Sequence, residues 1–328
     1  MEFEAVTLAN QQIIQPYLYR YGAGSCQHSF ASMYCLADKY GDSFCEKDGW
    51  MLFYRAGIST PAERKYLMPM GDRTDREGLK KAIGAILEDA HSHHASACFQ
   101  TLLEADKEAV LLLYPDVFAA EAKRGYFEYI YSYERLADLP GSDMASKRYD
   151  ANLFYRTYGS RLRLERIEER HLDEIRAFQK VWLEQRIKEE EDVQLQLENT
   201  AILKGLAHFQ QLNMSGIVVY IDDVLCGYAF GAPLSRQYYD VMYEKGDRSY
   251  QDIYKILNRD LVRQCCQGFL YINREEDLNV AGLRKAKLSY KPDFLLQKYC
   301  LREVRHAQDP ERRPQRQQES GQHDFPGQ

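Results

Sequence analysis

The segment between residues 271 and 292 carries many charged side chains around a few apolar ones: Arg274, Glu275, Glu276, Asp277, Arg284, Lys285, Lys287 and Lys291. Such a cluster could form one wall of a pocket for a charged substrate, where a carboxylate deprotonates an attacking amine. It could equally be a solvated network of ion pairs on a surface helix. The two interpretations place the same residues in different surroundings, so the neighbouring elements matter.

These elements place the acids where a ligand could bind. Residues 268–273 (GFLYIN) predict a buried strand, and the polar residues that follow lie at its carboxyl end, where α/β folds bind ligands. A helix should come next, capped by Asp277 or Asn279 and packed through Val280, Leu283 and Ala286. We therefore predict Glu275 and Glu276 as catalytic residues. We predict that Asn273, Arg274, Asp277, Arg284 and Lys287 bind substrate.

One order of elements occurs twice along the chain. Residues 216–231 predict a hairpin around Asp222, and a third strand, a helix over 250–266 and a further strand follow. In the first half, a hairpin around Asp48-Gly49 precedes a strand, the helix 76–90 and another strand. The repeated order indicates a duplicated α/β domain, and chance matching of a common order is the alternative.

This order resembles that of the GNAT acyltransferase fold, in which two neighbouring strands splay and receive the acyl donor. The predicted fold class is α/β (α+β), with two tandem GNAT-like domains, each a mixed and mostly antiparallel sheet flanked by helices. We place the domains at residues 1–158 and 159–305. Residues 306–328 are rich in Pro, Gln, Arg and Gly, a composition typical of a disordered tail.

Three segments resemble a known bacterial family, the C-terminal domain of phosphatidylglycerol lysyltransferases and especially its soluble, uncharacterised members. They are SFASMYCLADKYG from Ser29, LADLPGSDMASKRYDANLF from Leu136, and NREEDLNVAGLRKAK from Asn273, which is the most specific. The resemblance covers about residues 17–301. It implies tandem GNAT-like domains and kinship with aminoacyltransferases that use aminoacyl-tRNA. It also marks Glu198, Lys147 and Arg148, which lie in family-like patterns.

The resemblance to GNAT enzymes assigns further positions. Their coenzyme A loop resembles Q/R-x-x-G-x-G/A, but the segment here offers only Gly246, preceded by Lys245. Asp247 and Asp252 already place negative charge at the following helix start, which disfavours acyl-CoA. An ordinary capped helix start is the alternative for this loop. If Tyr290 is the aromatic residue that closes the last helix, Lys285, which we predict to be catalytic, occupies the place of the usual tyrosine acid. Either another group would then protonate a coenzyme A thiolate, or the leaving group is a ribose hydroxyl of tRNA.

Two further groups have an ordinary alternative. Glu198 is predicted to be catalytic if it points into the pocket, although an exposed glutamate is the simpler interpretation. Lys147 and Arg148 could join Arg161, Arg163, Arg284, Lys285 and Lys287 in a cleft for tRNA phosphates. Scattered surface charge is the alternative.

The composition of the 328 residues is that of a soluble globular protein, with 45% hydrophobic residues and a formal charge of −6. The eight cysteines show no CxxC pair, so we expect buried thiols in a reducing compartment. The histidines of HSHH (91–94) lack partners at ligand spacing, and we predict no metal. No signal peptide and no membrane span is apparent, so we expect a cytoplasmic protein without a DNA partner.

The leading hypothesis is therefore an acyltransferase that moves an aminoacyl or other acyl group to an amine or hydroxyl acceptor. The donor would be aminoacyl-tRNA or acyl-CoA, and no cofactor is assigned. The competing hypothesis is a non-catalytic module that binds a small ligand or RNA on a degenerate GNAT fold. Function belongs to the site rather than to the fold, so the two hypotheses share the same architecture.

Overall fold

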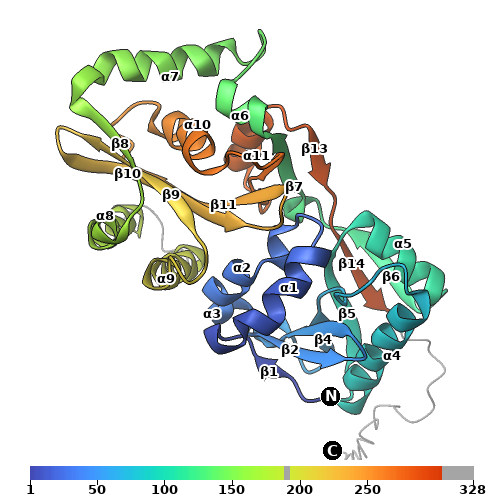
Figure 1. Cartoon of the computed structure of the whole chain (residues 1–328). Coiled ribbons are helices and arrows are strands. Elements are labelled where there is room, and N and C mark those ends of the chain that lie inside the picture. Colours follow the sequence, from blue (N-terminus) through green and yellow to red (C-terminus); the bar gives the residue numbers. More distant parts are fainter. Residues whose placement is uncertain (188–192, 305–328) are drawn as a thin grey trace, which may run out of the picture.

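The computed structural model describes residues 1–187 and 193–304, and Figure 1 shows their arrangement as two sheets with helices around them. The predicted disordered tail, 306–328, lies outside the described residues. None of the helices within these ranges combines the length and the apolar character needed to cross a lipid bilayer.

The first sheet has seven strands in the order β1-β2-β3-β4-β5-β14-β6. The predicted hairpin is present, because Asp48 and Gly49 both have positive φ angles and close a tight two-residue turn between β2 and β3. The strands are β1 (Glu4–Ala5), β2 (Asp42–Lys47), β3 (Trp50–Arg55), β4 (Glu63–Tyr66), β5 (Ser96–Leu102), β6 (Phe118–Ala122) and β14 (Tyr299–Glu303). The α-helices of this half are α1 (Gln11–Tyr21), α2 (Phe30–Cys35), α3 (Ala37–Tyr40), α4 (Arg76–Ser92) and α5 (Glu104–Leu113).

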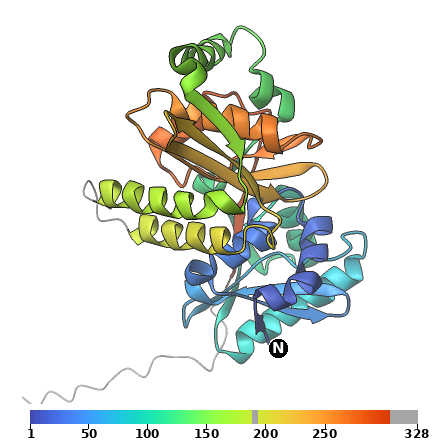
Figure 2. The ribbon, with the colours of Figure 1, turned by 60° about the vertical axis from the view of Figure 1, so that its left-hand side comes forward.

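The second sheet also has seven strands, in the order β13-β7-β12-β11-β10-β9-β8. They are β7 (Glu128–Ser132), β8 (Leu162–Arg166), β9 (Ser215–Ile221), β10 (Val224–Pro233), β11 (Tyr238–Gly246), β12 (Tyr271–Asn273) and β13 (Phe294–Leu296). Its α-helices are α6 (Tyr133–Asp138), α7 (Ala145–Tyr158), α8 (Leu172–Ile187), α9 (Val193–Ala207), α10 (Ile253–Cys265) and α11 (Ala281–Leu288). In Figures 1 and 2, α8 and α9 lie side by side on one face of this sheet, and α10 covers the other.

The two sheets exchange strands. β7 belongs to the first half of the chain but lies in the second sheet, between β12 and β13. β14, the last described strand, lies in the first sheet between β5 and β6. Each sheet therefore includes a strand from the other side of the predicted domain boundary at residues 158 and 159. That boundary stays a prediction.

Two neighbouring strands of the second sheet diverge, as the repeated order of elements predicts. β11 and β12 run parallel and pair only from Tyr238 to Asp240 on β11, although β11 continues to Gly246. In β10, opposite this point, the register shifts between Phe230 and Gly231. A bulge of this kind bends a strand and increases its twist. The carboxyl half of β11 is therefore free of β12, and the loop after β12 faces it.

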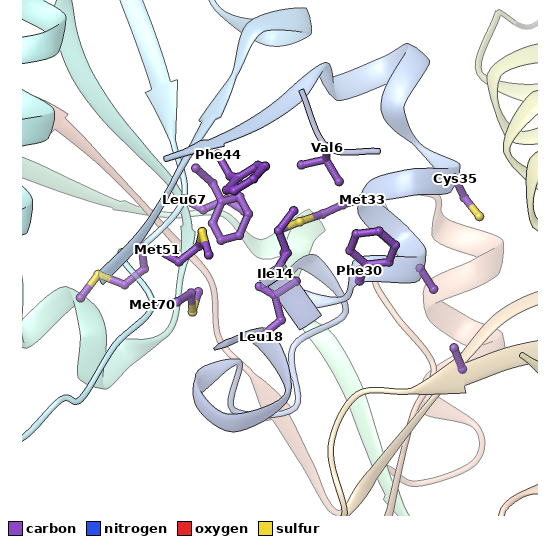
Figure 3. Close-up of a cluster of buried hydrophobic side chains, with 14 of the residues drawn as sticks. Val6, Ile14, Leu18, Phe30, Met33, Cys35, Phe44, Met51, Leu67 and Met70 are labelled. Carbon is purple, nitrogen blue, oxygen red and sulfur yellow. The ribbon is translucent and has the colours of Figure 1, made fainter. Parts of the chain in front are cut away.

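A continuous apolar core joins the two halves and fixes the walls of this gap. Figure 3 shows Ile14, Phe30, Met33 and Phe44 within the cluster of the first half. The same cluster includes Ile202 and Leu206 of α9 and Phe230 of β10, so α2 and α9 are packed against each other. A second cluster fills the space between the second sheet and α10. Burial of this kind, at about 25 cal/mol per Å² of apolar surface, holds the two halves in one arrangement.

Two local expectations need correction. The helix predicted over 250–266 begins only at Ile253, because Asp252 has a positive φ of 69° that no α-helix continues through. α11 does not pack through Leu283 and Ala286, which are exposed; its buried residue is Lys287. The Lys287 ammonium donates to the carbonyl oxygens of Arg274 and Glu276 and so finds polar partners inside.

Candidate functional site

A cavity of about 390 Å³ lies between the two halves, next to the diverging strands. Helices α2 and α3 form one wall, α9 a second, and β11 with the loop after β12 a third. The lining residues are Cys26, Gln27, Ser32, Met33, Leu36, Lys39, Tyr40, Arg55, Gln194, Leu195, Leu197, Glu198, Met242, Tyr243, Glu275, Glu276, Leu278 and Val280. Three predicted catalytic acids, Glu198, Glu275 and Glu276, thus share one cavity.

Side chains rather than glycines hold the loop after β12 in its shape. Glu275, Leu278 and Asn279 all have positive φ angles, a conformation that costs free energy for residues with a side chain. The Asn273 Oδ1 accepts from the Glu275 backbone N–H at 2.7 Å, and Lys287 binds two loop carbonyls. Burial lowers the pKa of Lys287, but its carbonyl partners are those of a structural support.

Asp277 is the second support of this loop. It is fully buried and accepts hydrogen bonds from the Nε and Nη2 atoms of Arg284, at 2.7 and 2.8 Å, and from the Tyr129 hydroxyl at 2.6 Å. Arg124 adds a contact at 3.0 Å. Burial raises the pKa of Asp277, but the hydrogen bonds from Arg284 and Tyr129 outweigh it and hold the pKa well below its usual value. Asp277 and Arg284 thus fix the loop, and their predicted contact with substrate stays a prediction.

Glu276 and Glu275 line the cavity without a cationic partner among the described residues. Glu276 accepts from the Gln27 side chain at 2.7 Å, Gln27 accepts from Arg55, and Arg55 forms an ion pair with Asp42. Burial, followed by the nearby charge of Glu128, raises the pKa of Glu276. Burial and the charge of Asp240 raise that of Glu275 well above its ordinary value. A raised pKa lets a carboxylate accept a proton at a rate useful for catalysis.

A fully buried ion pair lies behind this wall. The Lys298 ammonium is 2.6 Å from Glu128, and neither side chain is exposed to solvent. Glu128 also accepts from the Ser25 hydroxyl, the Cys26 backbone N–H and the Asn273 amide. The predicted residue Asn273 therefore anchors β12 to the first half of the chain.

The same place holds a group of atoms with the spacing of metal ligands. Ligand atoms of Cys26, Glu128 and Glu276 lie within 4.8 Å of one another. However, both oxygens of Glu128 already accept hydrogen bonds, and the ammonium of Lys298 would repel a cation. Burial, together with the charge of Glu128, raises the pKa of the Cys26 thiol well above its usual value. These residues therefore do not fit a metal ion.

Glu198, which is predicted to be catalytic, lies on the α9 wall of the cavity. The Lys245 ammonium is 2.8 Å from Glu198 and lies over the Trp182 ring, 4.3 Å from its centroid. Gly246 ends β11, and a Cβ atom there would come within 2.9 Å of Ile253. The glycine therefore permits close packing of α10 on β11, and its predicted contact with a donor stays a prediction.

Arg274, Lys147 and Tyr290 meet on the α10 side of the second sheet. Arg274 forms an ion pair with Glu244 at 2.8 Å, and its guanidinium lies over the Tyr290 ring. The Lys147 ammonium lies over the same ring, 4.1 Å from the centroid, and burial lowers its pKa. These three predicted residues are together but outside the cavity lining.

The remaining predicted cations are not gathered into one cleft. Lys285 is exposed on α11 and is not a lining residue, and Arg148 binds the carbonyl oxygens of Leu139 and Gly141. Arg161 and Arg163 pair with acids near β8, at the far edge of the second sheet. The catalytic role of Lys285 stays a prediction.

Several residues at the site were not predicted: Gln27, Asp42, Arg55, Glu128, Asp240 and Lys298. Two of them had a visible signal, because Glu128 and Asp240 are acids within apolar strand sequences, FEYIYS and QYYDVMYEK. A charged residue on a buried strand is rare unless it has a partner or a function. The others come from distant segments, and nothing in their local sequence marks them.

Comparisons with known proteins agree with this architecture. Residues 19–302 match the family described as phosphatidylglycerol lysyltransferase, C-terminal, and the chain belongs to that family. A conserved protein of unknown function from Bacteroides thetaiotaomicron has a solved structure with 26% identity and a TM-score of 0.86, over 93% of this chain and 100% of that one. The predicted family is confirmed.

More distant structures show the fold alone. L-PGS from Bacillus licheniformis is 15% identical with a TM-score of 0.62, over 90% of this chain and 93% of that one. A tandem GNAT protein from the clavulanic acid biosynthesis pathway is 10% identical with a TM-score of 0.50, over 92% and 98%. The predicted α/β fold with tandem GNAT-like domains is confirmed.

One curated relative aligns with part of the chain. An uncharacterized protein of Mycoplasmoides gallisepticum is 22% identical over 176 residues, which is 54% of this chain. The alignment spans 56% of that relative's length.

Proposed function

We propose that the protein is an acyltransferase that moves an aminoacyl or other acyl group to an amine or hydroxyl acceptor inside the cavity. The observation that carries this proposal is the position of Glu276, which faces the cavity at the diverging ends of β11 and β12. Its raised pKa and its lack of a cationic partner among residues 1–187 and 193–304 suit a general base. Membership in the lysyltransferase C-terminal family supports the class of reaction.

In the proposed reaction, the acceptor nitrogen or oxygen gives a proton to Glu276 and attacks the acyl carbonyl carbon. The new bond to the acceptor forms, the bond between the acyl carbon and the donor oxygen or sulfur breaks, and the leaving atom takes up a proton. Gln27 donates to Glu276 and orients its carboxylate, and Arg55 in turn orients Gln27. General-base assistance of this kind contributes about 10²- to 10⁴-fold in rate.

The start of α10 favours an ester donor over acyl-CoA. Asp247 accepts from the Ser249 backbone N–H, and Asp252 precedes the first helical residue. Lys255 forms ion pairs with both Asp252 and Asp150 and is therefore occupied. Negative charge at a helix N-terminus repels a pyrophosphate. We therefore propose aminoacyl-tRNA as the donor.

Asp247 and Asp252, which disfavour a coenzyme A donor, also favour the second candidate function, a non-catalytic module that binds a ligand in the cavity. The two functions are separated by incubating the full chain with tRNA charged with labelled amino acids, or with labelled acetyl-CoA, and with an amine or alcohol acceptor. The transferase yields a labelled amide or ester from aminoacyl-tRNA. Binding of a donor or acceptor without labelled product over many hours would contradict the transferase and support the module.

A further inference from the structure

The acidic end of the cavity has more negative charge than its protein partners neutralise. Asp42, Glu128 and Asp277 each form ion pairs, with Arg55, Lys298 and Arg284. Glu275 and Glu276, on the cavity wall, have no ion pair within the described ranges. Two carboxyl groups thus lack an ion-pair partner among the described residues where the cavity is open to a ligand.

A third carboxyl group, that of Asp240, adds an independent sign of a missing partner. Asp240 is fully buried on β11, in register with Asn273, and neither of its oxygens has a hydrogen-bond partner among the described residues. Burial, followed by the charges of Glu128 and Glu276, raises the pKa of Asp240 well above its ordinary value, and Asp240 in turn raises that of Glu275. A buried polar group without a partner is costly and rare in folded proteins. A cation bound at the neighbouring wall would favour the ionised form of this carboxyl group.

Apolar side chains form the body of the cavity, beside the charged lining residues Lys39, Arg55 and Glu198. Met33 and Leu36 of the first half face Leu195 and Leu197 of α9, and Met242 lies on β11. A volume of about 390 Å³ is that of a small-molecule site rather than an ion site. The cavity therefore combines one acidic end with an apolar body.

Three cations near this end are already engaged, and the Lys39 ammonium, on the α3 wall, lies over the Tyr40 ring. Lys298 is bound to Glu128, and Lys287 donates to the carbonyl oxygens of Arg274 and Glu276 rather than to a carboxylate. Arg55 is held by Asp42 and Gln27. The charge of Lys287 acts on Glu275, but none of these side chains forms an ion pair with it. A cation from outside would therefore give Glu275 an ion-pair partner that the described residues do not supply.

We propose that this end of the cavity binds the ammonium group of an alkylamine, and that this amine is the acceptor of the transfer reaction. The inference rests on the proposed function and chooses an amine over a hydroxyl. Glu275 and Glu276 contact the ammonium, Asp240 adds negative potential from within the wall, and the alkyl chain lies along the apolar body.

The chemistry balances with Glu276 as the base. The alkylammonium gives one proton to Glu276, and the neutral nitrogen attacks the acyl carbon. The bond between carbon and nitrogen forms, the bond between carbon and the donor oxygen breaks, and that oxygen leaves as the alcohol after taking up a proton. The second amine proton is released as the amide forms.

The test measures binding by the full chain without any donor, using calorimetry and the shift in melting temperature. The probes are n-alkylamines from butylamine to octylamine, with the n-alkanols and n-alkanoates of the same length as neutral and anionic controls. We expect the best amine to bind at least tenfold more tightly than its alkanol. Glu275→Gln and Glu276→Gln should each weaken the amine at least tenfold and leave the alkanol unchanged. Glu184→Gln, at an exposed acid on α8, should change neither.

Asp240→Asn tests the buried charge and should weaken the amine without changing the alkanol. If this variant does not fold, the two cavity-wall variants decide alone. Equal binding of amine and alkanol, no binding of any amine, or tight binding of Zn²⁺ or Mg²⁺ alone would overturn the inference. Amine binding without transfer would contradict the transferase and leave the ammonium site. Transfer to alcohols but not to amines would contradict the ammonium site and leave the transferase.

Discussion

The buried ion pair of Lys298 and Glu128 joins the places where the two sheets exchange strands. Lys298 directly precedes β14, which lies in the first sheet, and Glu128 begins β7, which lies in the second. The change Lys298→Met removes the cation and leaves the Glu128 carboxylate fully buried with three neutral donors, Ser25, Cys26 and Asn273. Removing one partner of a buried pair costs about 3–5 kcal/mol. We expect the Lys298→Met variant to lose that much of its free energy of unfolding, which is about 5–15 kcal/mol in total for a typical protein.

The double variant Glu128→Gln/Lys298→Met should recover about half of this loss or more, because no uncompensated charge stays buried. The free energy of unfolding is measured by urea titration, followed by circular dichroism and by the fluorescence of Trp50 and Trp182, which report on the two halves. A loss under 1 kcal/mol in the single variant would refute this account of the pair. A double variant as unstable as the single one would do the same.

Three further predictions concern Glu276, Asp277 and Lys285. Because its pKa is raised, Glu276 becomes protonated at a pH above the ordinary value of 4.5. Turnover should therefore fall as the pH drops through that raised pKa. Profiles of rate against pH for the Glu276→Asp variant should show a shifted midpoint. Asp277 has a lowered folded pKa, so its stabilising effect is present above the unfolded value of 3.8 and is lost as the pH falls further. Asp277→Asn should therefore flatten the acid limb of stability measured by urea titration between pH 2 and 6, and an unchanged limb would exclude the role of Asp277. Lys285 is exposed outside the cavity lining, and Lys285→Ala tests its predicted catalytic role: a tenfold or greater loss of turnover is expected if the role holds, and unchanged turnover would exclude it.

Local sequence patterns were enough for the individual elements. The period of two in β9 and β10, the Asp48-Gly49 turn and the apolar face of α10 each depend on residues close together in the chain. The exchange of β7 and β14 was out of reach, because strands of five residues carry a weak signal and pair with partners far away in sequence. The burial of Lys287 was not predicted for a related reason, since its carbonyl partners are defined only by the folded loop.

The candidate site was predictable on one side only. Glu275 and Glu276 were identified because they follow an apolar strand, a position where α/β folds bind ligands. Gln27 and Arg55, which orient Glu276, come from the first half of the chain and lie in segments that read as ordinary turn and strand. The packed core between α2 and α9, together with the exchange of β7 and β14, brings these halves together. The pairing of distant polar residues is a property of the fold that no local pattern contains.

The most direct test of the central claim is the single-turnover rate at which the labelled aminoacyl group passes from aminoacyl-tRNA to an alkylamine. Glu276→Gln preserves the oxygen that accepts from Gln27 and removes only the base. We predict a rate about 10²- to 10⁴-fold below that of the unaltered chain, with Glu184→Gln at the full rate. Amide formation at an equal rate in the Glu276→Gln variant, or none in the unaltered chain, would contradict the claim that this cavity carries out acyl transfer.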